Sequence, residues 1–324
     1  MSPRVSVIIT TYNHEAFIAE AVQSVLDQTY GDYELIVVDD GSVDGTLGQI
    51  ARFGDRARLI RQPNQGIAAS RNTGIRHARG ELLAFLDGDD VWEPGKLEYQ
   101  VAAAAAHPAS GLIAVDGVQF SGPSVLCPSL LAPSVQDLLS GRDSVTVRCY
   151  EQLLRGNLIS TTSQVMIPRH VFDAIGLSDG SFPVSSDRDL YIRIGARYEM
   201  TFVGRSLARW RYLPTSASGP EEVRWLRWAA DDIGILKKQL RVGLPAYRPL
   251  IRQLLRRDLR EAASTAYYHG LQTDRAFARR YLVALLRENA AYPVSASFLV
   301  ALYLPRFVSR AVGTTLRRLL RLPE

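Results

Sequence analysis

Short apolar runs and amphipathic segments alternate along the first hundred residues. Runs rich in β-branched residues predict strands at 5–10, 33–38, 58–60 and 82–86. Apolar residues at helical spacing predict helices at 17–26, at 67–78 and from Pro94 to about Ala106. Asn13 stands where it could cap the first of these helices. Alternating strands and helices are typical of βαβ units, so the sequence predicts an α/β fold with a mainly parallel sheet.

The pattern changes twice further along the chain. Residues 109–219 are less regular and hold several Gly, Pro and Ser clusters, whereas residues 220–324 are rich in Arg and read as helical. The net charge of +5 divides unevenly, with −5 in residues 1–219 and +10 in residues 220–324. We therefore expect one domain over 1–219, with halves at 1–108 and 109–219, and a basic helical region over 220–324.

Two predicted strands end in carboxylates. Asp87-Gly88-Asp89-Asp90 follows the strand at 82–86, and Asp39-Asp40 follows the strand at 33–38. Ligands of open parallel sheets bind at the carboxyl ends of the strands. Crowded carboxylates call for a cation such as a divalent metal, which would grip phosphate oxygens. A plain polar turn is the alternative for one cluster. If the two strand ends neighbour each other, both clusters face one crevice, which favours a metal–nucleotide site.

Several classes of protein are disfavoured. No Gly-x-x-x-x-Gly-Lys-Ser/Thr or Gly-x-Gly-x-x-Gly motif occurs, which argues against P-loop NTPases and nicotinamide dehydrogenases. The two cysteines, Cys127 and Cys149, provide neither a disulfide framework nor a zinc set. The N-terminus does not resemble a signal peptide, and no uninterrupted apolar stretch is long enough to span a bilayer. These features predict a cytoplasmic protein.

The motifs in this order resemble the family 2 inverting glycosyltransferases of GT-A fold. The resemblance is dense over residues 4–98 and looser over about 150–218. It is carried by Val5-Ser6-Val7-Ile8-Ile9-Thr10-Thr11-Tyr12-Asn13, Glu34-Leu35-Ile36-Val37-Val38-Asp39-Asp40-Gly41-Ser42, Ser70-Arg71-Asn72-Thr73-Gly74 and Asp87-Gly88-Asp89-Asp90-Val91-Trp92. It implies a Rossmann-like mixed sheet flanked by helices and a nucleotide-diphosphate-sugar donor, with UDP as the expected nucleotide.

The resemblance implies a role for each residue of the nucleotide half. Thr10, Tyr12 and Asp40 would contact the base, and Asp39 would support the ribose or the loop. Arg71 would lie near the diphosphate, with a surface salt bridge as its alternative. The Asp-x-Asp pair gives Asp89 as the metal ligand and Asp87 as its helper or a ribose contact, with Mn²⁺ or Mg²⁺ as the cofactor. Asp90 and Trp92 would contact the substrate. For Trp92, a place in the core is the alternative.

An inverting transfer also needs a general base, which the resemblance assigns to Asp187. Ser186 stands where Glu is common in the family, so Asp189 is kept as a second candidate, and helix capping is the alternative role for Asp187. Downstream, relatives often carry a His near position 212; here Arg209 or Arg211 would supply the cation.

The last residues predict a basic amphipathic helix. Over 304–322, apolar residues share one face and arginines gather opposite, which is typical of a helix on a membrane surface. Packing on the same protein or on a second subunit is the alternative, so a homo-oligomer stays open. No recognised nucleic-acid module accompanies the arginines, and we expect no nucleic-acid partner.

Together these features predict a metal-dependent inverting glycosyltransferase. Its acceptor would be a hydroxyl of a glycan or of a lipid-linked glycan, in surface polysaccharide or glycoconjugate synthesis at the inner face of the cell membrane. A sugar nucleotidyltransferase is one alternative, although the first turn lacks the Gly-rich, Arg-bearing loop of such enzymes. A catalytically degenerate subunit that binds a glycan or a partner is the other, supported by Ser186.

Overall fold

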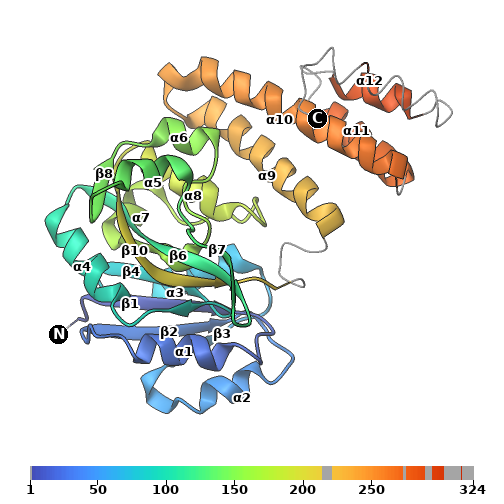
Figure 1. Ribbon diagram of the computed structural model, residues 1–324. Helices are drawn as coiled ribbons and strands as arrows, with labels where there is room; N and C mark the ends of the chain where they lie inside the picture. Colours follow the sequence, from blue (N-terminus) through green and yellow to red (C-terminus); the bar gives the residue numbers. More distant parts are fainter. Residues whose placement is uncertain (1, 214–220, 273–274, 289–293, 303–314, 316–324) are drawn as a thin grey trace. The chain divides into compact units, whose positions relative to one another are not determined.

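A computed structural model describes residues 2–213, 221–272, 275–288, 294–302 and 315 of the chain. The chain divides into two compact units, Met1–Ser216 and Ala217–Glu324. The first unit is an α/β structure built on one sheet, and the second consists of helices (Figure 1). Within the described ranges, no helix combines the length and the apolar character needed to cross a membrane.

Four parallel strands form the nucleotide half that the sequence predicted. The strands are β1 (Val5–Thr11), β2 (Tyr33–Asp39), β3 (Arg58–Arg61) and β4 (Leu82–Asp87). They lie in the order β3-β2-β1-β4, so β1 has β2 on one side and β4 on the other. The connecting helices are α1 (Ile18–Leu26), α2 (Thr46–Ala51), α3 (Ile67–His77) and α4 (Lys96–Ala106).

Alternation along β1 explains how helices come to cover both faces of this sheet. Val7 and Ile9 pack in one hydrophobic cluster with Ile18 of α1, whereas Ile8 meets Gly74 of α3 on the opposite face. Successive side chains of a strand point to opposite faces, so a strand buried on both sides needs a continuous apolar run. All seven residues of β1 are buried accordingly.

The second half of this unit continues the sheet with mixed strand directions. The order runs on from β4 through β9 (Val165–Pro168), β6 (Ser110–Ser121) and β10 (Glu199–Arg211) to β5 (Val91–Trp92). Strand β9 is antiparallel to both β4 and β6, whereas β10 is parallel to β6. Beside this path lie β7 (Ser124–Cys127), β8 (Ser144–Val147), α5 (Pro133–Leu139), α6 (Tyr150–Arg155), α7 (Arg169–Ile175) and α8 (Ser186–Gly195).

The second unit contains α9 (Glu221–Val242), α10 (Arg248–Gln272), α11 (Arg275–Glu288) and α12 (Val294–Ala301). Helix α10 packs against the other three. Tyr267 of α10 and Phe298 of α12 are fully buried, with ring centroids 5.3 Å apart. The predicted amphipathic helix at 304–322 lies outside the described residues, apart from Thr315.

Replacement of Gly74 by Ala is expected to destabilise the first unit. A Cβ atom at Gly74 would lie 2.3 Å from Cγ2 of Ile8, so α3 and β1 would have to move apart. Overpacking of this kind costs roughly 1–3 kcal/mol. Urea denaturation would measure the loss in the free energy of unfolding.

The helical Gly48 provides the control, because a Cβ there meets nothing within 4 Å. Gly48→Ala should instead stabilise by about 0.5–1 kcal/mol, since Ala restricts the unfolded chain and favours helix. Equal effects of the two substitutions would contradict the close packing of α3 on β1.

Candidate active site

The two acidic strand ends flank the carboxyl end of β1, which separates them in the sheet. In the strand register, Thr11 lies opposite Asp39 of β2, and Thr10 lies opposite Asp87 of β4. Asp39-Asp40 and Asp87-Gly88-Asp89-Asp90 are therefore one strand apart at the same edge of the sheet. This edge is where ligands of open α/β sheets bind.

The first pair of carboxylates organises loops. Asp39 is fully buried, accepts from the Ser42 N–H at 3.2 Å and has Nε of Arg61 at 3.4 Å. Asp40 accepts from Nε2 of Gln62 at 2.7 Å and from the backbone N–H of Gly66 at 2.8 Å. It also accepts from the N–H of residue 65 at 3.0 Å, and only 4% of its surface is exposed. Asp40 thus holds the loop 62–66 and has little free surface for the expected base contact.

The loop after β1 presents Tyr12 to solvent. Its side chain is 43% exposed, as a ring that stacks on a ligand would need to be. The next residue, Asn13, has a φ of 54° and does not cap α1, contrary to the sequence prediction. It joins two loops instead, since its N–H donates to Oγ of Ser42 and its Oδ1 accepts from Val43 N–H, both at 2.9 Å.

The three carboxylates after β4 have different partners. Asp87 accepts from Nη2 of Arg71 at 2.9 Å and from Oγ1 of Thr10 at 3.4 Å. The buried Asp90 accepts from the backbone N–H of Arg211 at 2.9 Å. Asp89 is only half-buried, and its Oδ2 lies 4.0 Å from Nε2 of a histidine, His14.

Three consecutive hydroxyl residues, Thr161, Thr162 and Ser163, form what we call the hydroxyl clasp. Thr162 Oγ1 donates to Asp87 at 3.0 Å, and Thr161 Oγ1 donates to Asp90 at 3.3 Å. Ser163 Oγ donates to Asp90 at 2.5 Å and accepts from the Asp87 N–H at 3.1 Å. The clasp therefore fixes the two outer carboxylates and leaves the carboxylate of Asp89 outside its hydrogen bonds.

The sequence analysis did not identify the clasp or His14. The clasp belongs to a 3₁₀ turn, Thr162–Gln164, with a capping box between Thr161 and Gln164. A Thr-x-x-Gln pattern before a short apolar run was the available signal. What it could not reveal is that this turn lies beside a strand end some 75 residues earlier in the chain.

Burial and mutual repulsion make the carboxylate cluster receptive to a cation. The pKa of Asp90 is held well above its usual range by burial and then by the charges of Asp89 and Asp87. Burial also raises the pKa of Asp89, and Asp87 adds to this, whereas His14 opposes it. A nearby cation would lower both pKa values because it stabilises the charged carboxylates.

The donors fit a hard divalent cation held in part by its substrate. Asp89, the half-buried carboxylate outside the clasp, would be the direct ligand, with Asp87 beside it. Within the described ranges, no three His, Cys, Asp or Glu side chains are grouped to hold a metal. Magnesium sites commonly use one or two carboxylates, with water and phosphate oxygens as the other ligands.

Asp187 approaches the same cluster from the other half of the unit. It lies in the first turn of α8, where its Oδ1 accepts from the Arg188 N–H at 2.8 Å. The N-cap position is held by Ser185, so Asp187 is not the capping residue. The charges of Asp87 and then Asp187 raise the pKa of Arg71 against the opposing effect of its burial. Arg71 therefore lies near both acidic groups, and it lines the same cavity as Asp187.

Burial raises the pKa of the Asp187 carboxyl, although Arg71 opposes the shift. Asp187, Arg71, Thr162 and Tyr191 help to line a cavity of about 10 Å³. That volume is close to the minimum that one water molecule needs. Tyr191 is fully buried, and its hydroxyl has no hydrogen-bond partner among the described residues. A carboxylate with a raised pKa beside such a cavity is suited to accept a proton.

The structure corrects two assignments and changes a third. Asp189 is fully buried and pairs with Arg193 at 2.8 Å, so it is not available as the second candidate base. Trp92 is 3% exposed and packs in the core with its Nε1 donating to Ser163 O, so it does not line a sugar pocket. Arg211 donates through Nε to the Asp89 carbonyl at 2.8 Å and supports the acidic turn.

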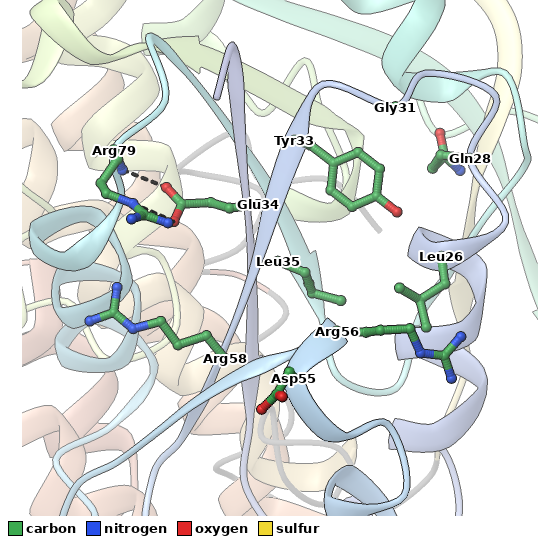
Figure 2. Close-up of a pocket in the computed structure, with 10 residues that line it drawn as sticks. All are labelled: Leu26, Gln28, Gly31, Tyr33, Glu34, Leu35, Asp55, Arg56, Arg58 and Arg79. Atoms are coloured by element: carbon green, nitrogen blue, oxygen red, sulfur yellow. Dashed lines mark hydrogen bonds and ion pairs between the residues drawn. The ribbon is translucent and has the colours of Figure 1, made fainter. Parts of the chain in front are cut away.

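The largest pocket we describe lies elsewhere. Figure 2 shows a pocket of about 580 Å³ around Tyr33 and Glu34, at the amino end of β2. The Glu34 carboxylate there is paired with Arg79 at 2.9 Å. Because the acidic clusters follow the carboxyl ends of the strands, this pocket is not part of the candidate site.

Known proteins resemble this chain in sequence and in fold. The sequence pattern of glycosyl transferase family 2 matches residues 6–123. WfgD of Escherichia coli, a UDP-Glc:alpha-D-GlcNAc-diphosphoundecaprenol beta-1,3-glucosyltransferase, is 43% identical over 100 residues, which cover 30% of this chain and 40% of WfgD. The chain spans between 31% and 58% of the lengths of WfgD and several other curated relatives that it matches.

Two solved structures share the fold at low identity. S. aureus TarS 1-349 in complex with UDP-GlcNAc has a TM-score of 0.65 at 16% identity, covering 99% of this chain and 90% of that one. A mannosyltransferase from Pyrobaculum calidifontis in complex with GDP-Man and Mn²⁺ has a TM-score of 0.57 at 19% identity, covering 98% and 85%. The mixed, mainly parallel sheet flanked by helices is the GT-A fold.

Removal of the Ser163 hydroxyl from the clasp should destabilise the protein. Ser163→Ala would leave the buried Asp90 without its shortest hydrogen bond and the Asp87 N–H without an acceptor. Unsatisfied buried groups cost roughly 1–3 kcal/mol each. The free energy of unfolding in urea would show the loss.

Ser124→Ala is the matched control, because Ser124 is exposed at the start of β7. Its effect should stay within about 0.5 kcal/mol. The clasp would have no structural role if Ser163→Ala were as mild as this control.

Proposed function

Because its sequence places the chain among the family 2 glycosyltransferases, we propose that it transfers a sugar from a nucleotide-diphosphate donor, UDP-linked, to a hydroxyl, with inversion. The acceptor in this proposal is a glycan or lipid-linked glycan of a surface polysaccharide. The UDP-linked donor and the lipid-diphosphate acceptor in the name of WfgD support both choices. UDP-GlcNAc in the complex of TarS supports the donor as well.

One observation carries the proposal. Asp89, outside the hydroxyl clasp, and Asp187, on a separate element, belong to one charge network through Asp87 and Arg71. Transfer with inversion requires a group that holds the departing diphosphate and a second group that deprotonates the acceptor. These two carboxylates, both outside the hydroxyl clasp, are suited to these two tasks.

The nucleotide half would bind the donor. The exposed ring of Tyr12 offers a face to the base, while Asp39 and Asp40 hold the loops around it. Asp89, with Asp87, would hold Mn²⁺ or Mg²⁺, which acts as a Lewis acid on the phosphates when bound. Mn²⁺ in the mannosyltransferase complex supports the choice of metal. Arg71 orients Asp87 through its 2.9 Å contact.

Asp187 would be the general base. Its raised pKa lets it take the proton of the acceptor hydroxyl as the oxygen attacks the anomeric carbon, opposite the bond to the diphosphate. The neighbouring Arg71 stabilises the charged form of Asp187 between turnovers. The proton then leaves to solvent from the partly exposed end of the α8 first turn.

The charge of the last third bears on both the acceptor and the location. The basic last third, with a net charge of +10, favours work at the anionic inner face of a cell membrane, where lipid-linked acceptors lie. Incubation with UDP-sugars, Mn²⁺ and glycan acceptors tests the reaction. Release of UDP supports it, whereas release of pyrophosphate would indicate a nucleotidyltransferase, and no turnover of any donor would indicate a binding subunit.

Asp187→Asn should lower kcat/KM by about 10²–10⁴-fold, the usual contribution of a general base. In the unchanged protein, kcat/KM should rise with pH as Asp187 loses its proton. Because the pKa of Asp187 is raised, this limb of the pH profile should have its midpoint above the pKa of about 3.9 of an ordinary aspartate. Asp187→Asn should abolish the limb.

Asp173→Asn is the control for that experiment, since Asp173 is an exposed carboxylate on the neighbouring helix α7. It should leave both kcat/KM and the pH profile unchanged. An Asp187→Asn protein with full activity would refute the assignment of the base.

Asp89→Asn should remove the metal-dependent part of donor binding. In thermal-shift measurements, UDP-sugar with Mn²⁺ should raise the melting temperature of the unchanged protein more than UDP-sugar with EDTA does. Asp89→Asn should show equal shifts in both conditions, because it lacks the direct carboxylate ligand. Asp55→Asn, which changes an exposed carboxylate, should behave as the unchanged protein.

A further inference from the structure

The turn between α9 and α10 exposes apolar side chains at the end of a helical hairpin. Val242 is 68% exposed and Leu244 is 39% exposed. Pro245 and Ala246, which follow in the turn, are exposed as well. Turns between packed helices are usually polar, so consecutive exposed apolar residues there suggest a binding surface.

The same turn lies within a stretch without acidic residues. From Ile233 to Arg257 the sequence contains no Asp or Glu, and its cations are Lys237, Lys238, Arg241, Arg248, Arg252, Arg256 and Arg257. The five arginines are exposed. The hairpin end therefore joins an apolar tip to a concentrated positive charge.

Three of these arginines form a row along α10. Arg248, Arg252 and Arg256 follow one another at intervals of four residues, so they share a face of the helix. The adjacent face, with Ile251 and Leu255, is buried in the unit. Like charges four residues apart destabilise a helix. In the described part of the chain, neither Arg248 nor Arg252 forms an ion pair that would offset this repulsion.

We propose that this hairpin end, consisting of Val242, Leu244 and the arginines at 241, 248 and 252, binds the surface of an anionic membrane. The arginines would contact lipid phosphates, and the two apolar side chains would enter the interface between headgroups and acyl chains. A nucleic acid or a charged glycan would match the arginines alone and would leave the apolar tip exposed. This surface is separate from the helix predicted at 304–322.

Binding of a membrane would deepen the proposed function. It rests on that function only for the reason why the protein would lie on a membrane. A lipid-linked acceptor stays in the membrane, so an enzyme bound to the membrane surface would encounter its acceptor by diffusion within that surface. Binding to lipid is itself independent of the chemistry. The two proposals can therefore fail separately.

The test is co-sedimentation of the full chain with vesicles of phosphatidylcholine, with and without phosphatidylglycerol. Binding should require phosphatidylglycerol and should weaken as salt rises. Arg248→Gln with Arg252→Gln should weaken it by roughly 25-fold, at about fivefold for each surface cation. Arg52→Gln with Arg58→Gln removes the same charge from exposed positions of the first unit and should leave binding unchanged.

A second variant tests the apolar tip. Val242→Ser with Leu244→Ser should weaken binding to the same vesicles while leaving the retention on heparin unchanged. Binding of the arginine variant as tight as that of the unchanged chain would overturn the proposal. So would a tip variant that binds vesicles normally, since the surface would then be a general polyanion site.

Release of UDP with a soluble acceptor separates this proposal from the proposed function. Arg248→Gln with Arg252→Gln should release UDP at the unchanged rate. An unchanged chain that releases UDP but does not bind vesicles would overturn the membrane surface alone. An unchanged chain that binds vesicles as described and turns over no donor would support the surface and overturn the proposed function.

Discussion

Mutual repulsion between buried carboxylates at one edge of the sheet is the constraint around which the first unit is built. Asp87, Asp89 and Asp90 lie at the end of a single strand, and burial together with their mutual repulsion raises the pKa values of Asp89 and Asp90. Burial without compensation would protonate such groups or unfold the turn. The hydroxyl clasp and Arg71 supply hydrogen bonds to the two outer carboxylates, and this difference leaves Asp89 as the one suited to a metal.

The clasp also joins the two halves of the unit. Its residues come from the second half, while the carboxylates they hold come from the first. Arg71 completes the link, because it pairs with Asp87 and stabilises the charge of Asp187 on α8. The proposed donor site and the proposed base, about a hundred residues apart in the chain, are thus coupled through one cation. In the proposed reaction, this arrangement would hold the acceptor hydroxyl and the donor diphosphate in a fixed position relative to each other.

The second unit follows a different principle. Its helices bury apolar faces against one another, and arginines provide most of its positive charge. Helix α10 gives up stability through its row of like charges. This row begins close in the chain to the exposed Val242 and Leu244. Binding to a partner surface therefore explains the composition of the hairpin end better than folding stability does.

The sequence by itself determined the α/β alternation, the strands β1 to β4, the helices α1, α3 and α4 and the presence of carboxylates at two strand ends, because these depend on local periodicity and on the rules of parallel sheets. Only the tertiary structure decided which carboxylates remain available. Trp92 packs in the core, Asp189 forms an ion pair with Arg193, and Asn13 joins two loops instead of capping a helix. Each of these outcomes depends on partners far away in the chain, since a hydrogen bond or an ion pair forms wherever folding brings its two groups together.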